Sequence, residues 1–111
     1  MGHPELIPGT LEALILRTVA GEPKHGYGIA QAIRQASGDV LIVEEGSLYP
    51  ALQRLVRKGD LAAEWGQSEN NRRARFYRLT PAGRKRLGQE VPELERLVAA
   101  IFRVLRPAEG G

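Results

Sequence analysis

Apolar side chains recur along this chain with two different periods, and the change of period divides it into segments. Up to residue 59 the apolar positions follow the i, i+3, i+4 spacing of helices that bury one face. Between residues 61 and 79 they alternate at every second position, as in strands. After residue 81 the helical spacing returns and continues to about residue 105. We therefore predict three helices, a two-stranded hairpin and a long last helix.

The first predicted helix covers Thr10–Ala20, with Thr10 as its N-cap. Ala13 and Leu16 widen its apolar surface beyond one stripe, which suggests a second contact, such as another subunit. The second helix covers Lys24–Ala36. The segment 40–43 is too short for a helix and rich in β-branched residues, so we expect a short strand or an extended buried link.

The third predicted helix, within residues 45–59, has one apolar face and one polar face without acids. Proline has no backbone N–H, so Pro50 should lie among the first four positions of the helix, which makes Ser47 the expected N-cap. Gly59 suits the position just after the last turn. The apolar face holds Leu48, Ala51, Leu52, Leu55 and Val56, and the polar face holds Tyr49, Pro50, Gln53, Arg54, Arg57 and Lys58.

The alternating segment predicts a hairpin whose strands are joined by a polar, basic loop over residues 66–73. In its second strand, 74–79, we expect Tyr77 and Leu79 to face inward and Phe76 and Arg78 outward. Thr80 and Pro81 should then start the last helix as N-cap and first helical residue.

The last helix, from about Pro81 to about Leu105, carries apolar residues spaced 4-3-4-3-4. This spacing favours packing on a partner helix, and the alternative is that the helix folds back on the first helix of the same chain. Pro92 should kink or bend it, with a full break as the second choice. The expected dimer contacts are Leu87, Val91, Leu94, Val98, Ile101 and Leu105.

Composition narrows the class of protein. A chain of 111 residues can form one domain with a modest core, and no apolar run reaches the roughly 20 residues needed to cross a membrane. No secretory signal is evident at the N-terminus and cysteine is absent, so we expect a cytoplasmic protein. The net charge of +3 is unevenly spread. Residues 70–86 contain seven basic side chains and no acid, as expected for a protein that binds a polyanion.

This order of elements predicts a mostly α fold with a two-stranded β wing, namely a winged helix-turn-helix followed by a long C-terminal dimerisation helix. We divide it into a DNA-binding domain over residues 1–80, a dimerisation helix over 81–106 and a disordered tail over 107–111. Three motifs carry a family resemblance: His25-Gly26-Tyr27-Gly28-Ile29, Gly46–Leu55 (GSLYPALQRL) and Arg75–Gly83 (RFYRLTPAG). In this order they resemble the PadR family of bacterial transcriptional regulators.

The resemblance implies a dimeric DNA-binding repressor of the short type, with one C-terminal dimerisation helix. Two copies of the third helix should then reach successive major grooves, so the operator should be roughly palindromic. We expect Gln53 and Arg54 to pair with base edges. Contacts to the DNA backbone are expected from the first turns of two helices and from the wing. The remaining expected DNA-binding residues are Lys24, His25, Ser47, Tyr49, Pro50, Arg72, Arg73 and Arg75.

Other interpretations stay open for several of these residues. Tyr49 could pack against the second helix, and His25 could be a capping or surface histidine. We interpret Arg57 and Lys58 as solvated charges of a last helical turn. The whole domain could also be a winged-helix protein-interaction module without specific DNA binding.

The resemblance also implies a small-molecule effector, which some relatives hold in an apolar pore at the dimer interface. Tryptophan on the last helix can line that pore in relatives, whereas the only tryptophan here, Trp65, lies in a wing strand. The sequence has no metal-ligand spacing, no phosphate-binding glycine loop and no nucleophile motif. We therefore expect no enzymatic activity, no metal and no cofactor.

Overall fold

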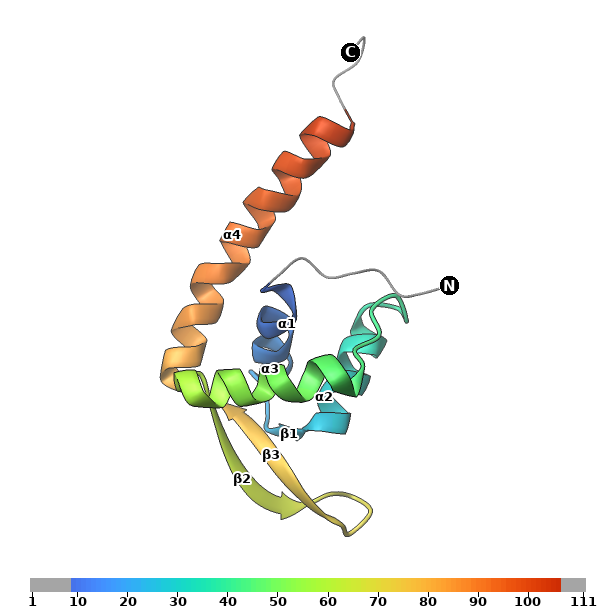
Figure 1. Cartoon of the computed structure of the whole chain (residues 1–111), viewed down its shortest axis with the longest axis vertical. Coiled ribbons are helices and arrows are strands. Elements are labelled where there is room, and N and C mark those ends of the chain that lie inside the picture. Colours follow the sequence, from blue (N-terminus) through green and yellow to red (C-terminus); the bar gives the residue numbers. More distant parts are fainter. Residues whose placement is uncertain (1–8, 107–111) are drawn as a thin grey trace.

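The computed structural model describes residues 9–106, and it has four helices and three strands in this part of the chain. In Figure 1 the first helices of the chain pack together, a hairpin projects from one side of them, and the last helix extends away. Their order is α1 (Thr10–Thr18), β1 (Lys24–His25), α2 (Gly26–Ala36), α3 (Glu45–Lys58), β2 (Leu61–Gln67), β3 (Arg73–Leu79) and α4 (Pro81–Leu105). The expected tail, 107–111, lies outside the described residues. The fold is the predicted winged helix with a long terminal helix.

The starts of three helices differ from one another in how they are capped. Thr80 caps α4 as predicted, because its hydroxyl accepts a hydrogen bond from the Gly83 N–H at 3.0 Å. Thr10 was the wrong N-cap for α1. Gly9 holds that position in a left-handed conformation, which glycine adopts without a steric cost, and Thr10 is already helical. His25 caps α2, so the helix begins one residue after it.

Helix α3 begins earlier than predicted. Its N-cap is Glu44 and not Ser47, which lies in the first turn of the helix. Pro50 is therefore inside the helix, where no N–H is available for the carbonyl of Gly46. Gly46 is exposed, so that carbonyl faces solvent and the chain tolerates the lost hydrogen bond. Gly59 ends the helix in the left-handed conformation, as predicted.

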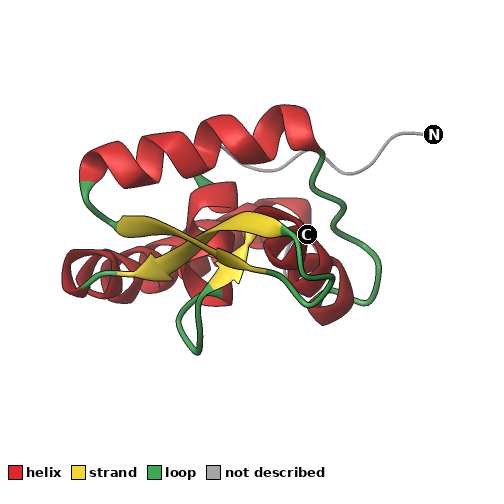
Figure 2. Ribbon diagram, turned by 90° about the horizontal axis from the view of Figure 1, so that it is seen from below, coloured by secondary structure: helices red, strands yellow, loops and turns green. Residues whose placement is uncertain are grey.

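The sheet contains one more strand than the sequence indicated. The strand order is β1-β3-β2, with both pairs antiparallel. Lys24 and His25, expected in the second helix, are extended and pair with Tyr77 and Phe76 of β3. The segment 40–43 contains no strand and is a link between helices, but Val40 is 58% exposed and residues 41–43 are half-buried, so the expected burial is only partial. Figure 2 is viewed from the hairpin side, with the strands in front of the helices.

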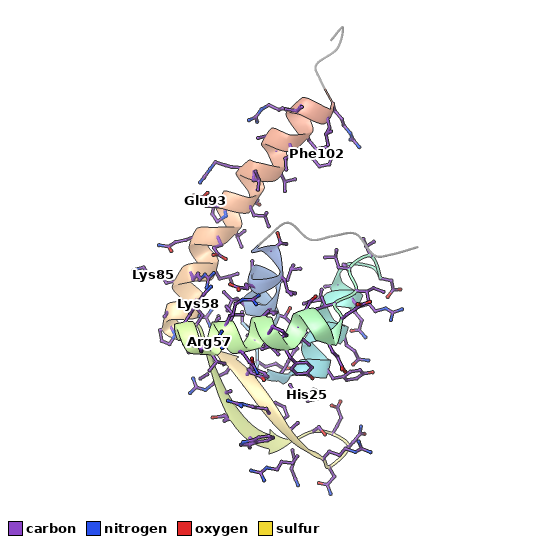
Figure 3. The ribbon with its side chains drawn as sticks, in the orientation of Figure 1. His25, Arg57, Lys58, Lys85, Glu93 and Phe102 are labelled. Atoms are coloured by element: carbon purple, nitrogen blue, oxygen red, sulfur yellow. The ribbon has the colours of Figure 1, made fainter. Side chains whose placement is uncertain are left out.

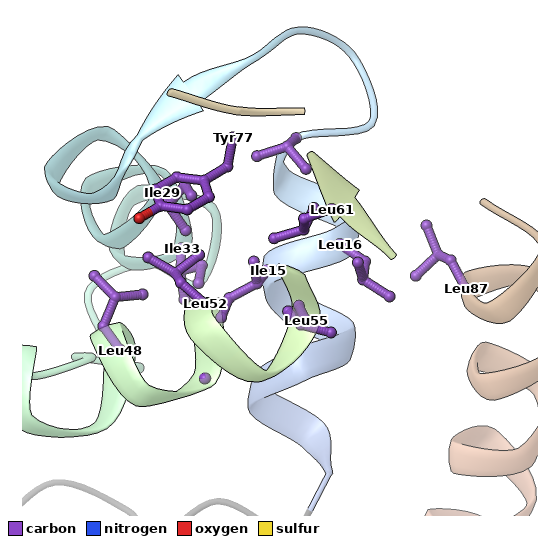
Figure 4. Packing of buried hydrophobic residues seen from close by; sticks show 12 residues of the cluster. Ile15, Leu16, Ile29, Ile33, Leu48, Leu52, Leu55, Leu61, Tyr77 and Leu87 are labelled. Carbon is purple, nitrogen blue, oxygen red and sulfur yellow. The ribbon is translucent and has the colours of Figure 1, made fainter. Parts of the chain in front are cut away.

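One hydrophobic cluster joins the four helices and the strands β2 and β3 (Figure 4). Leu16 of α1 is fully buried in it and not on a surface for a second subunit, so that part of the first prediction was wrong. Leu87 of α4 points toward Leu16 and is also part of this core. The other buried members are Ile15, Val19, Ile29, Ile33, Leu48, Ala51, Leu52, Leu55, Leu61 and Tyr77.

Helix α4 runs without a break through Pro92, which excludes the second choice made for this residue. Its first turns are fixed to the core at Gly83, where an added Cβ would lie 2.1 Å from the carbonyl oxygen of Asp60. The later turns of the helix extend past α1 (Figure 1). Among residues 9–106, no helix is long and apolar enough to cross a membrane.

Candidate nucleic-acid interface

The polar face of α3 is open to solvent along its length. Four side chains expected there are exposed, namely Ser47, Pro50, Gln53 and Arg54. The fifth, Tyr49, is 41% exposed and packs with one side against α2, because a Cβ added at Gly26 would lie 2.8 Å from its hydroxyl oxygen. The alternative that Tyr49 packs against the second helix is thus correct for one side of its ring. The other side remains accessible to a ligand.

His25 connects the start of α2 to the wing. Its Nδ1 accepts a hydrogen bond from the Gly28 N–H at 3.1 Å, so the capping alternative is confirmed. Its Nε2 lies 3.8 Å from a carboxylate oxygen of Glu69 in the wing loop, and its ring meets Phe76 edge to face. Lys24, next to it, has its amine 3.6 Å from Glu22. Both predicted residues therefore lie at the junction of α2 and the sheet.

The basic side chains of the wing lie mainly at its far end. The strand register places Trp65 opposite Arg75, and Gln67 opposite Arg73. These four side chains lie on the same face of the hairpin as Leu61 and Tyr77, which are closer to the core. Arg73 also lies over the Trp65 ring, 4.7 Å from its centroid. Arg72, Arg73 and Arg75 are all exposed. The wing therefore presents cations and an aromatic ring together.

Tyr49 of α3, the start of α2 and the wing line a common open hollow of about 860 Å³. Its lining brings together most of the residues that the sequence singled out and adds Trp65, which had not been assigned to the interface. They include Lys24, His25, Tyr49, Trp65, Arg72, Arg73 and Arg75. Ser47, Pro50, Gln53 and Arg54 are not in this lining and lie on the exposed side of α3.

A buried carboxylate lies behind α3, and sequence reasoning did not identify it. The Glu12 side chain on α1 is only 9% exposed, and it accepts hydrogen bonds from Arg54 at 2.9 Å and Lys58 at 3.2 Å, both on α3. Arg86 of α4 adds a third bond at 2.9 Å. Burial alone would raise the pKa of Glu12, but these bonds and charges outweigh it and hold the pKa below its ordinary value.

Lys58 is therefore not a free, solvated charge, which corrects the interpretation made from the sequence. Arg54 likewise has a protein partner where a free base reader was expected. The available signal was the position of Glu12, which shares the helical stripe of Ile15, Leu16 and Val19. A carboxylate on an apolar stripe indicates cationic partners from other elements.

Arg86 extends this cluster to α4. It donates to Asp60, which follows α3, and to Glu90 one turn further along α4. Burial alone would lower the pKa of Arg86. The carboxylates of Asp60 and Glu90 outweigh this effect, so the pKa of Arg86 lies above its ordinary value. The cluster of Glu12, Arg54, Lys58, Asp60 and Arg86 thus joins α1, α3 and α4, and it is called the Glu12 cluster below.

An exposed helix face, a basic wing and a hollow between them define a winged-helix protein of the DNA-binding type. The model of the PadR-like family of transcriptional regulators matches residues 15–89, so the chain belongs to that family. Members of this family are regulators of transcription and not enzymes.

Individual relatives are consistent with this membership. A transcriptional regulator of Mycobacterium tuberculosis is 34% identical over 88 residues, which are 79% of this chain and 78% of that protein. A transcriptional regulator from Clostridium thermocellum has a TM-score of 0.77 and 28% identity, covering 86% of this chain and 92% of the other. PadR of Bacillus subtilis, solved with operator DNA, has a TM-score of 0.66 and 21% identity. The match covers 74% of this chain and 46% of that chain.

Proposed function

We propose that this protein is a homodimeric repressor that binds a palindromic operator through α3 and the basic wing. The observation that carries the proposal is the shared hollow, because it joins cations of the wing to the α2–α3 surface on one side of the molecule. A polyanion bound there would meet Arg72, Arg73 and Arg75 at the wing while α3 enters a major groove. PadR of Bacillus subtilis, which shares this fold, was solved in complex with operator DNA, and this supports DNA as the ligand.

The dimer is proposed from the distal half of α4. Ile101, Phe102 and Leu105 are 37%, 45% and 65% exposed, and α4 has no neighbouring element there among residues 9–106. Leu94 and Val98 are half-buried, and Val91 is exposed. Leu87 is buried in the chain's own core and is not available to a partner. We therefore assign the dimer contact to the segment from Val91 to Leu105 and remove Leu87 from the predicted set.

A small-molecule effector would fit beside this dimer contact. A groove of about 370 Å³ lies between the start of α1 and the middle of α4, with Ala13, Leu94 and Leu97 in its lining. The buried hydroxyl of Thr10 at this groove has no hydrogen-bond partner among the described residues. Titrating a fluorescent aromatic cation into DNA-free protein tests the site. Leu97→Lys should weaken the binding, because it removes an apolar contact and adds a charge that repels the cation, and equal binding by this variant would place the dye elsewhere.

The experiment that tests DNA binding is a salt titration of fluorescence anisotropy with a 30-base-pair duplex. Wild-type affinity should fall steeply with salt, because each phosphate contact releases counterions. Arg72→Ala combined with Arg73→Ala should weaken binding and lower the slope of log K against log salt by roughly two. Arg96→Ala combined with Arg103→Ala removes the same charge from α4 and should leave the slope unchanged. Wild-type protein that binds no duplex at any salt concentration would refute the proposal.

A further inference from the structure

The outermost line of α3 is defined by its helical geometry. Residues at 100° steps place Gly46, Pro50, Gln53 and Arg57 directly opposite the buried set of Leu48, Ala51, Leu52 and Leu55. We call these four residues the outer ridge. Gly46 has no side chain and Pro50 has no hydrogen-bonding group. Within the outer ridge, only Gln53 and Arg57 can therefore form hydrogen bonds to a base through their side chains.

Arg54 and Lys58 lie about 60–100° away from the outer ridge, on the flank of α3 that faces α1. Both donate to the Glu12 carboxylate, which is almost fully buried. If Arg54 turned away, this buried carboxylate would lose one of its three donors and keep only Lys58 and Arg86. Turning Arg54 toward DNA would therefore work against the Glu12 cluster.

Arg57 differs from Arg54 in both respects. It is exposed, and it forms no ion pair with any residue from 9 to 106. Figure 3 shows it at the end of α3 that lies beside the first turns of α4. Because Gly46 and Pro50 are short, the other end of α3 can approach the groove floor closely, and the long Arg57 side chain can span the larger distance that remains.

We infer that Arg57, and not Arg54, is the arginine of α3 that reads a base, as the second reader beside Gln53. This inference rests on the proposed function. A guanidinium can pair with both O6 and N7 of guanine, and a glutamine amide can pair with adenine in the same way. Gln53 and Arg57 are four residues apart, a rise of about 6 Å. At about 3.4 Å per base pair, the structure assigns an adenine and a guanine about two base pairs apart in each half-site.

The test is selection of duplexes from a random DNA pool by wild-type protein, Arg57→Ala, Arg57→Lys and Arg54→Ala. Wild-type protein should enrich a guanine at one position of each half-site. Arg57→Ala should lose that preference on the order of tenfold and keep the others. Arg57→Lys keeps the charge but lacks the paired donors, so it should recover affinity more than selectivity. Arg54→Ala should select the wild-type sequence.

Two outcomes separate this inference from the proposal beneath it. If wild-type protein selects a defined sequence and Arg57→Ala selects the same one, or if Arg54→Ala loses the guanine, Arg57 is not the reader. If wild-type protein enriches nothing, the proposed function fails and the inference fails with it. Thermal melts of each variant establish that the proteins compared are folded. Arg57 is exposed and unpaired among residues 9–106, so its substitution should leave the melting temperature close to that of the wild type.

Discussion

Replacing Glu12 by glutamine removes one negative charge from between three cations and keeps the shape of the side chain. Arg54 and Lys58 of α3 and Arg86 of α4 all donate to this carboxylate. Glutamine retains one acceptor oxygen and introduces two donors, which would point at cationic partners. We expect the variant to fold and to be less stable than the wild type.

The size of the loss follows from the exposure of the three partners. Removing one member of a buried ion pair costs about 3–5 kcal/mol when its partner stays buried and uncompensated. Here Arg54 and Lys58 are 45% and 47% exposed, so water can solvate them after the change. Arg86 is more buried but keeps Asp60 and Glu90. We therefore expect a loss of about 1–3 kcal/mol in the free energy of unfolding at neutral pH.

The stability difference between the wild type and Glu12→Gln should depend on pH. The pKa of Glu12 in the folded protein lies below the ordinary value of 4.5. A lowered carboxyl pKa contributes stability above the unfolded pKa, and that contribution is lost as the pH falls through the folded pKa. The difference in stability between the wild type and Glu12→Gln should be full at pH 7. It should begin to shrink near pH 4.5 and approach zero at lower pH.

Urea unfolding at a fixed protein concentration, followed by circular dichroism at pH 7 and at about pH 3, measures both quantities. Glu64→Gln is the matched control, because this carboxylate is exposed and has no ion pair within residues 9–106. It should change stability by less than about 0.5 kcal/mol. A Glu12→Gln variant as stable as the control at pH 7, or a difference that persists unchanged at low pH, would refute the reasoning.

Two further predictions concern α4, one about its packing on the core and one about the dimer contact, and each has a matched control. Gly83→Ala should destabilise by about 1–3 kcal/mol or more, because its Cβ would meet the Asp60 carbonyl at 2.1 Å. Gly88→Ala, with open space around it, should be neutral or stabilising by up to about 1 kcal/mol in the same thermal melts, and equal losses in both would contradict the close packing at Gly83. Ile101→Asp should convert the dimer to a monomer in analytical ultracentrifugation, whereas Gln89→Asp adds the same charge to the opposite side of α4 and should leave it dimeric. Dimers in both variants would place the contact elsewhere.

Much of this fold could be predicted because its elements follow local rules. The buried stripe of α3, the hairpin and the Thr80 cap each depend on residues close together in the sequence. The short strand β1 could not be predicted, because two residues have no periodicity and Lys24 and His25 become a strand only by pairing with β3. The starts of α1 and α3 were also missed, because these helices begin without a side-chain capping hydrogen bond and so carry no capping pattern in the sequence.

The candidate DNA interface was predictable to a different degree. Charge and spacing identified the basic wing and the polar face of α3. They could not show which arginine of that face is free, because Glu12 precedes Arg54 by 42 residues and their contact depends on how α1 crosses α3. The same limit applies to Leu87, which fits the heptad spacing of α4 but is buried against α1.

The central claim is that one dimer places two copies of α3 on one duplex. A spacing series tests it most directly, with the selected half-site written as an inverted repeat and its centres moved from about 10 to about 15 and 20 base pairs apart. Affinity should be highest near one helical turn, about 10–10.5 base pairs, and lowest near one and a half turns, where the second half-site faces away. Affinity that does not depend on spacing, or that equals the affinity of a single half-site, would contradict the claim.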